Sequence, residues 1–190
     1  SMEFEKGNSY GFVGPNGCGK SVFFKTLCGY SLLDSGQVIY DGRIIGKDID
    51  FIDDAGVVIE QPEFINELSG MKNLKILSEI KNVIHDDDIN DTLKKFGLYE
   101  ERDKKVGKYS VGMKQKLRLV QAFMEKPKIM ILDEPMNGLD KKSVHAVEEL
   151  LKQFVRDGGT LLMTSHIEQQ LNSCCDIMYE MEDAGFTRIG

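Results

Sequence analysis

The chain has 190 residues, of which 41% are hydrophobic and 29% are charged, which is the balance of a folded soluble domain and excludes a mainly disordered chain. Its 24 Lys and Arg and 31 Asp and Glu give a formal net charge of −7, which disfavours an unaided electrostatic grip on DNA, RNA or an anionic bilayer. We therefore expect one compact domain in which any polyanion is bound by a dedicated pocket.

No apolar run approaches the roughly 20 residues that span a bilayer, and residues 1–6 contain no hydrophobic signal segment. We therefore expect a cytoplasmic protein. The cysteines are too few and too unevenly spaced to predict a disulfide framework or a zinc site. We expect reduced thiols at Cys18, Cys28, Cys174 and Cys175.

Short apolar runs alternate with longer amphipathic stretches, which predicts an α/β fold with a largely parallel sheet. The expected strands cover residues 9–13, 56–60, 129–132 and 160–164. Each ends beside polar residues, so we expect chemistry at the carboxyl ends of the strands, where open α/β sheets bind ligands. Between the first two strands, the Asp-Gly pair at 41–42 predicts the tight turn of a hairpin.

Apolar residues at helical spacing replace the strand pattern between residues 65 and 125. Two stripes lie there: Ile89, Leu93 and Phe96, and then Met113, Leu117, Val120 and Phe123. We predict one domain over 1–190, with an inserted helical lobe at about 65–125 between core segments at about 1–64 and 126–190. A further helix is expected over 141–156, with Asp140 as its N-cap.

The strongest local motif is the glycine-rich segment at 14–21, which follows an expected strand and precedes a helical run. It matches G-x-x-x-x-G-K-[ST], in which backbone N–H groups wrap a phosphate chain, the Lys neutralises phosphate oxygens and the Ser can ligate Mg²⁺. A flexible glycine turn is the alternative, which the flanking strand and helix disfavour. The expected phosphate-binding residues are Asn16, Gly17, Cys18, Gly19, Lys20 and Ser21.

Two adjacent acids, Asp133 and Glu134, directly follow the apolar strand at 129–132. Burying a strand up to a carboxylate pair is costly unless a cation or a proton transfer uses the pair. We expect Asp133 to belong to the Mg²⁺ shell and Glu134 to polarise an attacking water. Taken alone, such a pair is also typical of a helix cap.

Further motifs follow one another in an order that resembles the ATP-binding cassette (ABC) family. The segment Tyr109-Ser110-Val111-Gly112-Met113-Lys114-Gln115-Lys116-Leu117 is similar to the signature of that family. The other landmarks are the phosphate loop, Gln61, the two acids, residues 137–140 and residues 164–166. The Gly-Met-Lys-Gln form resembles the ATPase subunits of bacterial exporters for drugs and peptide antibiotics.

The resemblance implies a P-loop NTPase fold with a largely parallel sheet, the inserted α-helical lobe and a reduced antiparallel β lobe. It also implies a subunit that binds and hydrolyses ATP with Mg²⁺ and powers a separate membrane permease. This subunit would act as a head-to-tail dimer, with itself or a paralogous cassette, on the inner face of the cell membrane. No nucleic acid is expected as a partner. A soluble ABC-type ATPase and an ATP-switched binding module without transport stay open as alternatives.

The resemblance also implies individual roles. His166 contacts the γ-phosphate, and Gln61 touches Mg²⁺ and the attacking water. Ser110 and Gly112 meet the γ-phosphate of an ATP held by a second chain. Asp140 helps to join the two chains, which is compatible with its role as a helix cap.

The sequence departs from the family pattern at two places. Val111 replaces a glycine in the middle of the signature. Residues 2–7 resemble the strand just before the phosphate loop, so we expect the chain to begin inside its natural domain, truncated before the aromatic residue that stacks on adenine. The segment at 62–64 is our candidate for docking the membrane subunit, with Phe64 in the core of the helical lobe as the alternative.

Overall fold

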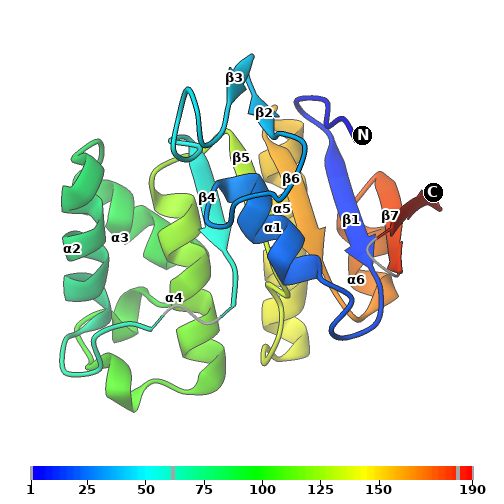
Figure 1. The fold of residues 1–190 in the computed structure, drawn as a ribbon. Coiled ribbons are helices and arrows are strands. Elements are labelled where there is room, and N and C mark those ends of the chain that lie inside the picture. The colour runs from blue at the N-terminus through cyan, green and yellow to red at the C-terminus, as the bar shows by residue number, and fades with distance from the viewer. Residues whose placement is uncertain (1, 61–62, 183–184, 190) are drawn as a thin grey trace.

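The computed structural model describes residues 2–60, 63–182 and 185–189 (Figure 1). Within these residues, a six-stranded sheet has the order β4-β5-β6-β1-β7-β8, and β2 and β3 form a separate hairpin. The elements are β1 (Ser9–Val13), α1 (Lys20–Cys28), β2 (Ile39–Tyr40), β3 (Arg43–Ile44), β4 (Ala55–Val58), α2 (Gly70–Lys81), α3 (Asp86–Lys95), η1 (Tyr99–Glu101), η2 (Val106–Lys108), α4 (Val111–Met124), β5 (Ile129–Leu132), α5 (Lys141–Arg156), β6 (Thr160–Thr164), α6 (Glu168–Cys174), β7 (Ile177–Glu182) and β8 (Gly185–Arg188).

Helices cover both faces of the sheet, with α1 in front and α5 and α6 behind it in Figure 1. Tyr10 and Phe12 of β1 are buried with Phe24 of α1 on the front face. On the other face, Leu161 and Met163 of β6 belong to a core cluster that also contains residues of α5 and α6. Because both faces are buried, the strands are nearly continuous apolar runs, as expected of a parallel sheet.

The predicted strands at 9–13, 129–132 and 160–164 are confirmed at both ends. The prediction of a strand at 56–60 is wrong at its end, because β4 covers Ala55–Val58. Glu60 has a φ of 58°, a left-handed conformation that does not continue a strand. Within the six-stranded sheet of the described residues, all neighbouring strand pairs are parallel except β7 and β8, two strands that we did not predict.

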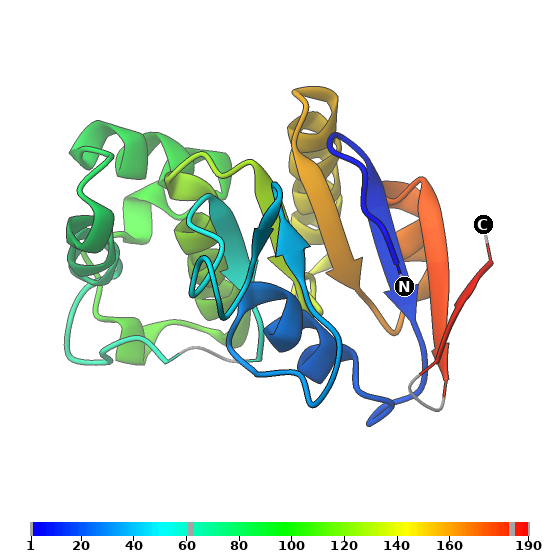
Figure 2. The same cartoon turned by 45° about the horizontal axis from the view of Figure 1, so that its top comes forward.

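The predicted hairpin is present, with β2 and β3 joined by two residues of positive φ. Asp41 has a φ of 51° and Gly42 a φ of 77°, as a tight hairpin turn requires. The Tyr40 hydroxyl donates to Oδ1 of Asp54 at 2.7 Å, which ties the hairpin to the loop before β4. The antiparallel part of the described chain is therefore small (Figure 2).

The segment between β4 and β5 is helical, as its apolar stripes predict. In Figure 1, α2 and α3 lie at the left of the molecule, and α4 lies between them and β4. Ile89 and Leu93 of α3 and Leu117 of α4 are buried in one cluster. The helix over 141–156 is confirmed at both ends. No helix in the described part of the chain is long and apolar enough to span a bilayer.

Candidate functional site

The loop between β1 and α1 is a tight turn closed around a lysine side chain. A Cβ on Gly14 would lie 2.3 Å from the carbonyl oxygen of Met181, so only glycine fits there. Gly19 begins α1 with a φ of 105°, a conformation that favours glycine. Lys20 is buried, and its Nζ donates to the carbonyl oxygens of Gly14 and Pro15 at 2.8 and 3.0 Å.

Among the described residues, no side chain caps the N-terminus of α1, so the first amides of this helix are available to an anion. Cys18 is half-buried beside it, and its Sγ lies 3.8 Å from Nζ of Lys20.

Burial raises the pKa of Cys28 and of Cys174 to about 12. Burial also raises the pKa of Cys175. All four cysteines are free.

The two acids after β5 lie beside the phosphate loop because β5, β6 and β1 are neighbours in the sheet. Ser21 of α1 donates through Oγ to Oδ2 of Asp133 at 2.5 Å. Thr164, the last residue of β6, donates through Oγ1 to Oδ1 of Asp133 at 2.6 Å. The carboxylate of Asp133 is thus held between a helix and a strand.

Glu134 adopts a strained backbone conformation that is fixed from both sides. Its φ is 50°, in the left-handed region that costs a non-glycine residue on the order of 1–3 kcal/mol. Its N–H donates to Oγ1 of Thr164 at 3.0 Å. Its Oε2 lies 2.8 Å from Nδ1 of His166, which follows β6. Thr164 therefore positions both acids, and the acids and the imidazole gather at one edge of the sheet.

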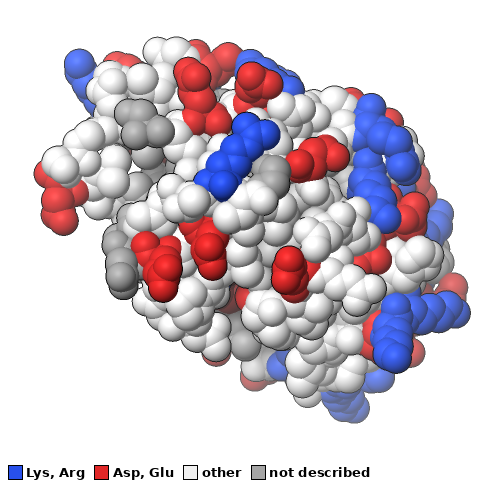
Figure 3. All heavy atoms as spheres, turned by 90° about the vertical axis from the view of Figure 1, so that its right-hand side faces the viewer, with Lys and Arg blue, Asp and Glu red and all other residues white. Residues whose placement is uncertain are grey.

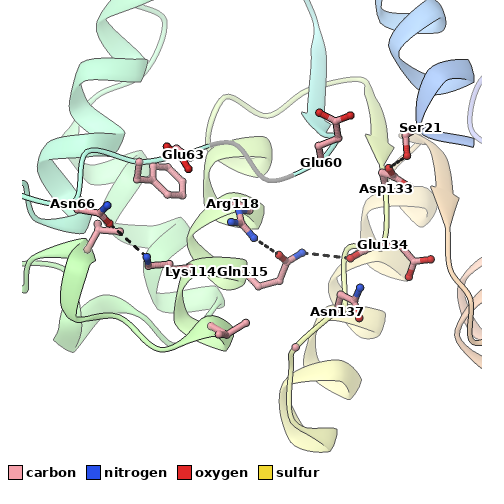
Figure 4. Close-up of a pocket in the computed structure, with 14 residues that line it drawn as sticks. Ser21, Glu60, Glu63, Asn66, Lys114, Gln115, Arg118, Asp133, Glu134 and Asn137 are labelled. Atoms are coloured by element: carbon pink, nitrogen blue, oxygen red, sulfur yellow. Dashed lines mark hydrogen bonds between the residues drawn. The ribbon is translucent and has the colours of Figure 1, made fainter. Parts of the chain in front are cut away.

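A cavity of about 710 Å³ lies between this edge and the helical segment (Figure 4). Its wall on the sheet side includes Ser21, Asp133 and Glu134, and its wall on α4 includes Gln115 and Arg118. Gln115 bridges the two walls, because its Nε2 donates to the carbonyl oxygen of Pro135 at 2.8 Å. The remaining lining residues are Glu60, Glu63, Phe64, Asn66, Val106, Val111, Lys114, Asn137 and Gly138.

The start of α4 forms the far end of this region. Ser110 caps α4, because its Oγ accepts from the N–H of Met113 at 3.2 Å. Val111 is 73% exposed. A Cβ on Gly112 would lie 3.1 Å from the carbonyl oxygen of Gly138, so this turn packs closely on the loop before α5.

Asp140 caps α5 as predicted. Its Oδ1 accepts from the N–H of Ser143 at 2.8 Å. This hydrogen bond holds the pKa of the Asp140 carboxyl below its ordinary value. The two remaining histidines lie elsewhere: His85 begins α3, and His145 is an exposed residue of α5.

The structure thus brings together the phosphate loop, Asp133, Glu134 and His166. The described hydrogen bonds of the Ser110 side chain stay at the start of α4, away from the phosphate loop. The expected metal and water contact Gln61 lies outside the described residues.

Sequence reasoning assigned no role to three residues of this network: Thr164, Gln115 and Arg118. The contact of Thr164 with Asp133 could have been predicted from the pairing of β5 with β6. The register pairs Leu132 with Met163 and so places Asp133 opposite Thr164. Gln115 reaches from α4 to the loop after β5, and Arg118 contacts Gln115 on the same helix. The apolar stripe of α4 does not point to either residue.

Comparisons with known proteins agree with this geometry. The family model described as ABC transporter matches residues 1–137 of the chain. The chain is 41% identical, over 181 residues, to the uncharacterized ABC transporter ATP-binding protein YybJ of Bacillus subtilis (strain 168), and the match covers 95% of this chain and 83% of that protein. It is 34% identical, over 179 residues, to the lantibiotic transport ATP-binding protein SrtF of Streptococcus pyogenes, with 94% of this chain and 76% of that protein covered.

The fold is similar to that of the ATP-binding cassette MJ0796 in a dimeric, post-hydrolysis state bound to ADP and Pi. The TM-score is 0.87 at 20% identity, and the match covers 100% of this chain and 88% of that chain. The structural likeness supports the fold, and the sequence matches support the family. The chain belongs to the ABC transporter family and carries its ATP-binding, ATP-hydrolysing domain.

Proposed function

We propose that this chain hydrolyses ATP with Mg²⁺ at the sheet edge formed by β1, β5 and β6 and that it thereby powers a membrane permease. The observation that carries the proposal is a continuous set of hydrogen bonds. It runs from Ser21 through Asp133 and Thr164 to the backbone of Glu134, whose side chain contacts His166. The set joins the phosphate loop to the carboxylate of Glu134, a group that can accept a proton from water.

The phosphate chain of ATP is bound by the loop at 16–21. The uncapped amides at the start of α1 and the ammonium of Lys20 both face this loop, and each favours an anion. The carbonyl contacts of Lys20 show that its ammonium already lies within reach of the loop interior. Its charge would neutralise the β and γ oxygens.

Mg²⁺ fits the donors present at this edge. Ser21 offers a hydroxyl and Asp133 a carboxylate, 2.5 Å apart, and hard oxygen ligands are those that Mg²⁺ prefers. No group of three or more His, Cys, Asp and Glu gathers for a metal in the described ranges. We propose Gln61 as a further ligand. Bound there, Mg²⁺ supplies positive charge that offsets the charge developing on the phosphate oxygens.

Glu134 acts as the base that takes a proton from the attacking water. Its side chain is 24% exposed, so it combines access to water with the fixed backbone described above. His166 contacts Glu134 through Nδ1, which leaves Nε2 as the ring nitrogen available to a γ-phosphate oxygen. A proton on Nε2 would let the imidazole donate to that oxygen.

We also propose that two chains associate head to tail, either two copies or this chain and a paralogous cassette. In that arrangement Ser110 and Gly112 at the start of α4 face the γ-phosphate of an ATP held by the partner. The support in this chain is the uncovered helix start, where Val111 is 73% exposed. Asp140 caps α5 just after Gly138, on which Gly112 packs, and it is proposed to join the two protomers.

The 190 residues are proposed to act as one ABC ATPase domain, with core segments at about 1–64 and 126–190 and a helical lobe at about 65–125. Docking of the permease is proposed beside the lobe, at the segment 62–64, of which Pro62 lies outside the described residues. This would place the protein at the inner face of the cell membrane. The lantibiotic transport role of the Streptococcus pyogenes relative supports a permease partner over the two alternatives, a soluble ABC-type ATPase and an ATP-switched binding module.

On the face that carries β7 and β8, acidic and basic side chains are interspersed (Figure 3). The test is ATP turnover by the full-length subunit with and without Mg²⁺, together with its recovery from native membranes. Mg²⁺-dependent turnover and co-purification with a membrane protein are expected. Recovery with ribosomes or duplex DNA at physiological salt would contradict the transport role.

A further inference from the structure

The cavity wall on α4 contains a hydrogen-bonded pair that the mechanism above does not use. Arg118 donates through Nη1 to Oε1 of Gln115 at 2.9 Å. On its other side, Gln115 donates through Nε2 to the carbonyl oxygen of Pro135 at 2.8 Å and, more weakly, to that of Glu134 at 3.5 Å. Figure 4 shows Gln115 between Arg118 and the backbone after β5.

Arg118 holds the amide of Gln115 from its oxygen side. A guanidinium has only donors, so the atom of Gln115 that faces it must be the oxygen. The NH₂ group then has to face the two carbonyl oxygens across the cavity. Those carbonyls favour the same orientation, so Arg118 holds the amide from its oxygen side while the carbonyls hold it from its NH₂ side. Without Arg118, the amide of Gln115 is held from one side alone and is free to shift relative to the backbone after β5.

The backbone that Gln115 holds is the strained one. Glu134 keeps its φ of 50° only if the surrounding contacts fix it. Thr164 fixes the N–H of Glu134, and Gln115 holds the backbone that follows it, through the carbonyl of Pro135 at 2.8 Å and a weaker contact with the carbonyl of Glu134 at 3.5 Å. A released carbonyl side would let Glu134 relax toward ordinary φ values, which would move its carboxylate relative to His166.

The surroundings of Arg118 indicate that it contributes little to stability. Burial lowers the pKa of its guanidinium. Its Nε is buried and has no hydrogen-bond partner among the described residues. A side chain that is desolvated and left with an unpaired donor is a poor stabiliser of the fold. Its contact with Gln115 is therefore the feature of this side chain that bears on the site.

We propose that Arg118 is a positioning residue for hydrolysis, acting through the amide of Gln115 on the backbone of Glu134. The inference rests on the proposed role of Glu134 as the base. Arg118 touches neither nucleotide nor water in this account. It sets the geometry in which the carboxylate of Glu134 meets the reacting water, and so it affects the chemical step and leaves nucleotide binding unchanged.

The test is a double-mutant cycle in the full-length subunit with steady-state ATP turnover as the readout. Arg118→Met is expected to lower kcat about tenfold, which corresponds to about 1.4 kcal/mol, and to change KM for ATP less than about twofold. Gln115→Ala should lower kcat similarly. In the Gln115→Ala background, Arg118→Met should have no further effect, because the two residues act as one unit.

Two further variants separate positioning from loss of charge or fold. Arg118→Lys keeps a cationic donor and should recover most of kcat. Arg156→Met is the matched control, since Arg156 of α5 likewise donates to a glutamine oxygen, that of Gln153 at 3.0 Å, but is exposed and far along another helix. It should turn over ATP as the parent does. Thermal unfolding shows whether each variant is folded. If Arg118→Met does not fold, Arg118→Lys is compared with Arg118→Gln instead, and a lower kcat is expected for Arg118→Gln.

The outcomes divide cleanly. An unchanged kcat in Arg118→Met overturns the inference. The same holds if Arg118→Met lowers kcat in the Gln115→Ala background as much as it does in the parent. A rise in KM for ATP in Arg118→Met as large as its fall in kcat would also overturn the inference, because it would indicate a role in nucleotide binding. Failure of the proposed function is seen separately, since Glu134→Gln would then turn over ATP as the parent does.

Discussion

The Nδ1 atom of His166 lies 2.8 Å from Oε2 of Glu134, although 31 residues separate them in the chain. The contact follows from the sheet order, because Glu134 follows β5, His166 follows β6, and these strands are paired in parallel. Thr164 strengthens the arrangement by holding the N–H of Glu134. Two adjacent strand ends thus deliver a carboxylate and an imidazole to one point, which lies beside the phosphate loop.

Lys20→Ala is expected to abolish ATP binding as well as turnover. The buried ammonium of Lys20 lies inside the loop that would wrap the phosphates, and alanine removes its positive charge. Calorimetric titration of ATP measures the loss directly. Lys25→Ala is the control, because Lys25 lies on the same helix but pairs with Glu60 at the surface. Unchanged ATP affinity in Lys20→Ala would contradict the role of the loop.

Cys18 is expected to be the first cysteine alkylated, and bound ATP should protect it. It lies in the phosphate loop and is half-buried, whereas burial raises the pKa of Cys28, Cys174 and Cys175 and so suppresses their thiolates. Mass spectrometry after brief treatment with iodoacetamide measures the order of modification. Earlier modification of Cys174 or Cys175, or no effect of ATP at Cys18, would argue against this placement.

Asp140 is expected to make stability fall in acid. Its folded pKa lies below the ordinary 3.8 because it accepts from the N–H of Ser143. The unfolded chain therefore binds the proton more readily, so the stabilisation is complete above the ordinary pKa and is lost as the pH falls through the folded value. Asp140→Asn keeps a capping oxygen but does not titrate.

Urea unfolding measured between about pH 5 and pH 3 should therefore show a shallower loss of stability in Asp140→Asn than in the parent. Asp34→Asn, at an exposed loop position, is the control and should follow the parent. Identical pH profiles for the parent and Asp140→Asn would show that this cap does not contribute to acid sensitivity.

Phe64→Ala is expected to weaken association with the membrane subunit. Phe64 is half-buried at the cavity rim and packs partly against the main core, next to the exposed Glu63. Co-purification from membranes and transport by the assembled complex measure the effect. Phe51→Ala is the matched control, since Phe51 is an exposed aromatic of another loop. Loss of helical circular dichroism in Phe64→Ala would instead favour a core role for this side chain.

The parts of the site that the sequence predicts are those built from contiguous motifs. The phosphate loop between β1 and α1, the acids after β5 and the cap at Asp140 each depend on neighbours within a few residues, and each is where the pattern predicts it. Local chemistry determines them: left-handed glycine at a helix start, and an acceptor side chain before a helix.

The parts that could not be predicted depend on packing between distant segments. The link from Gln115 to Pro135 exists only because α4 packs against the loop after β5. Strand β7 was missed because its buried residues, Met178 and Met181, are three apart and methionine favours strands only weakly. The end of β4 was misplaced because the left-handed conformation of Glu60 has no signature in an apolar run.

The most direct test of the central claim is ATP turnover by Glu134→Gln. The amide keeps the shape of the side chain and loses its basicity, so ATP binding should persist while hydrolysis slows by about 100-fold or more, the typical contribution of a general base. Turnover and calorimetric affinity are measured on the same preparation, with Glu149→Gln on the exposed face of α5 as the control. Intact binding with slow hydrolysis is the predicted result, and turnover at the parent rate would contradict the account.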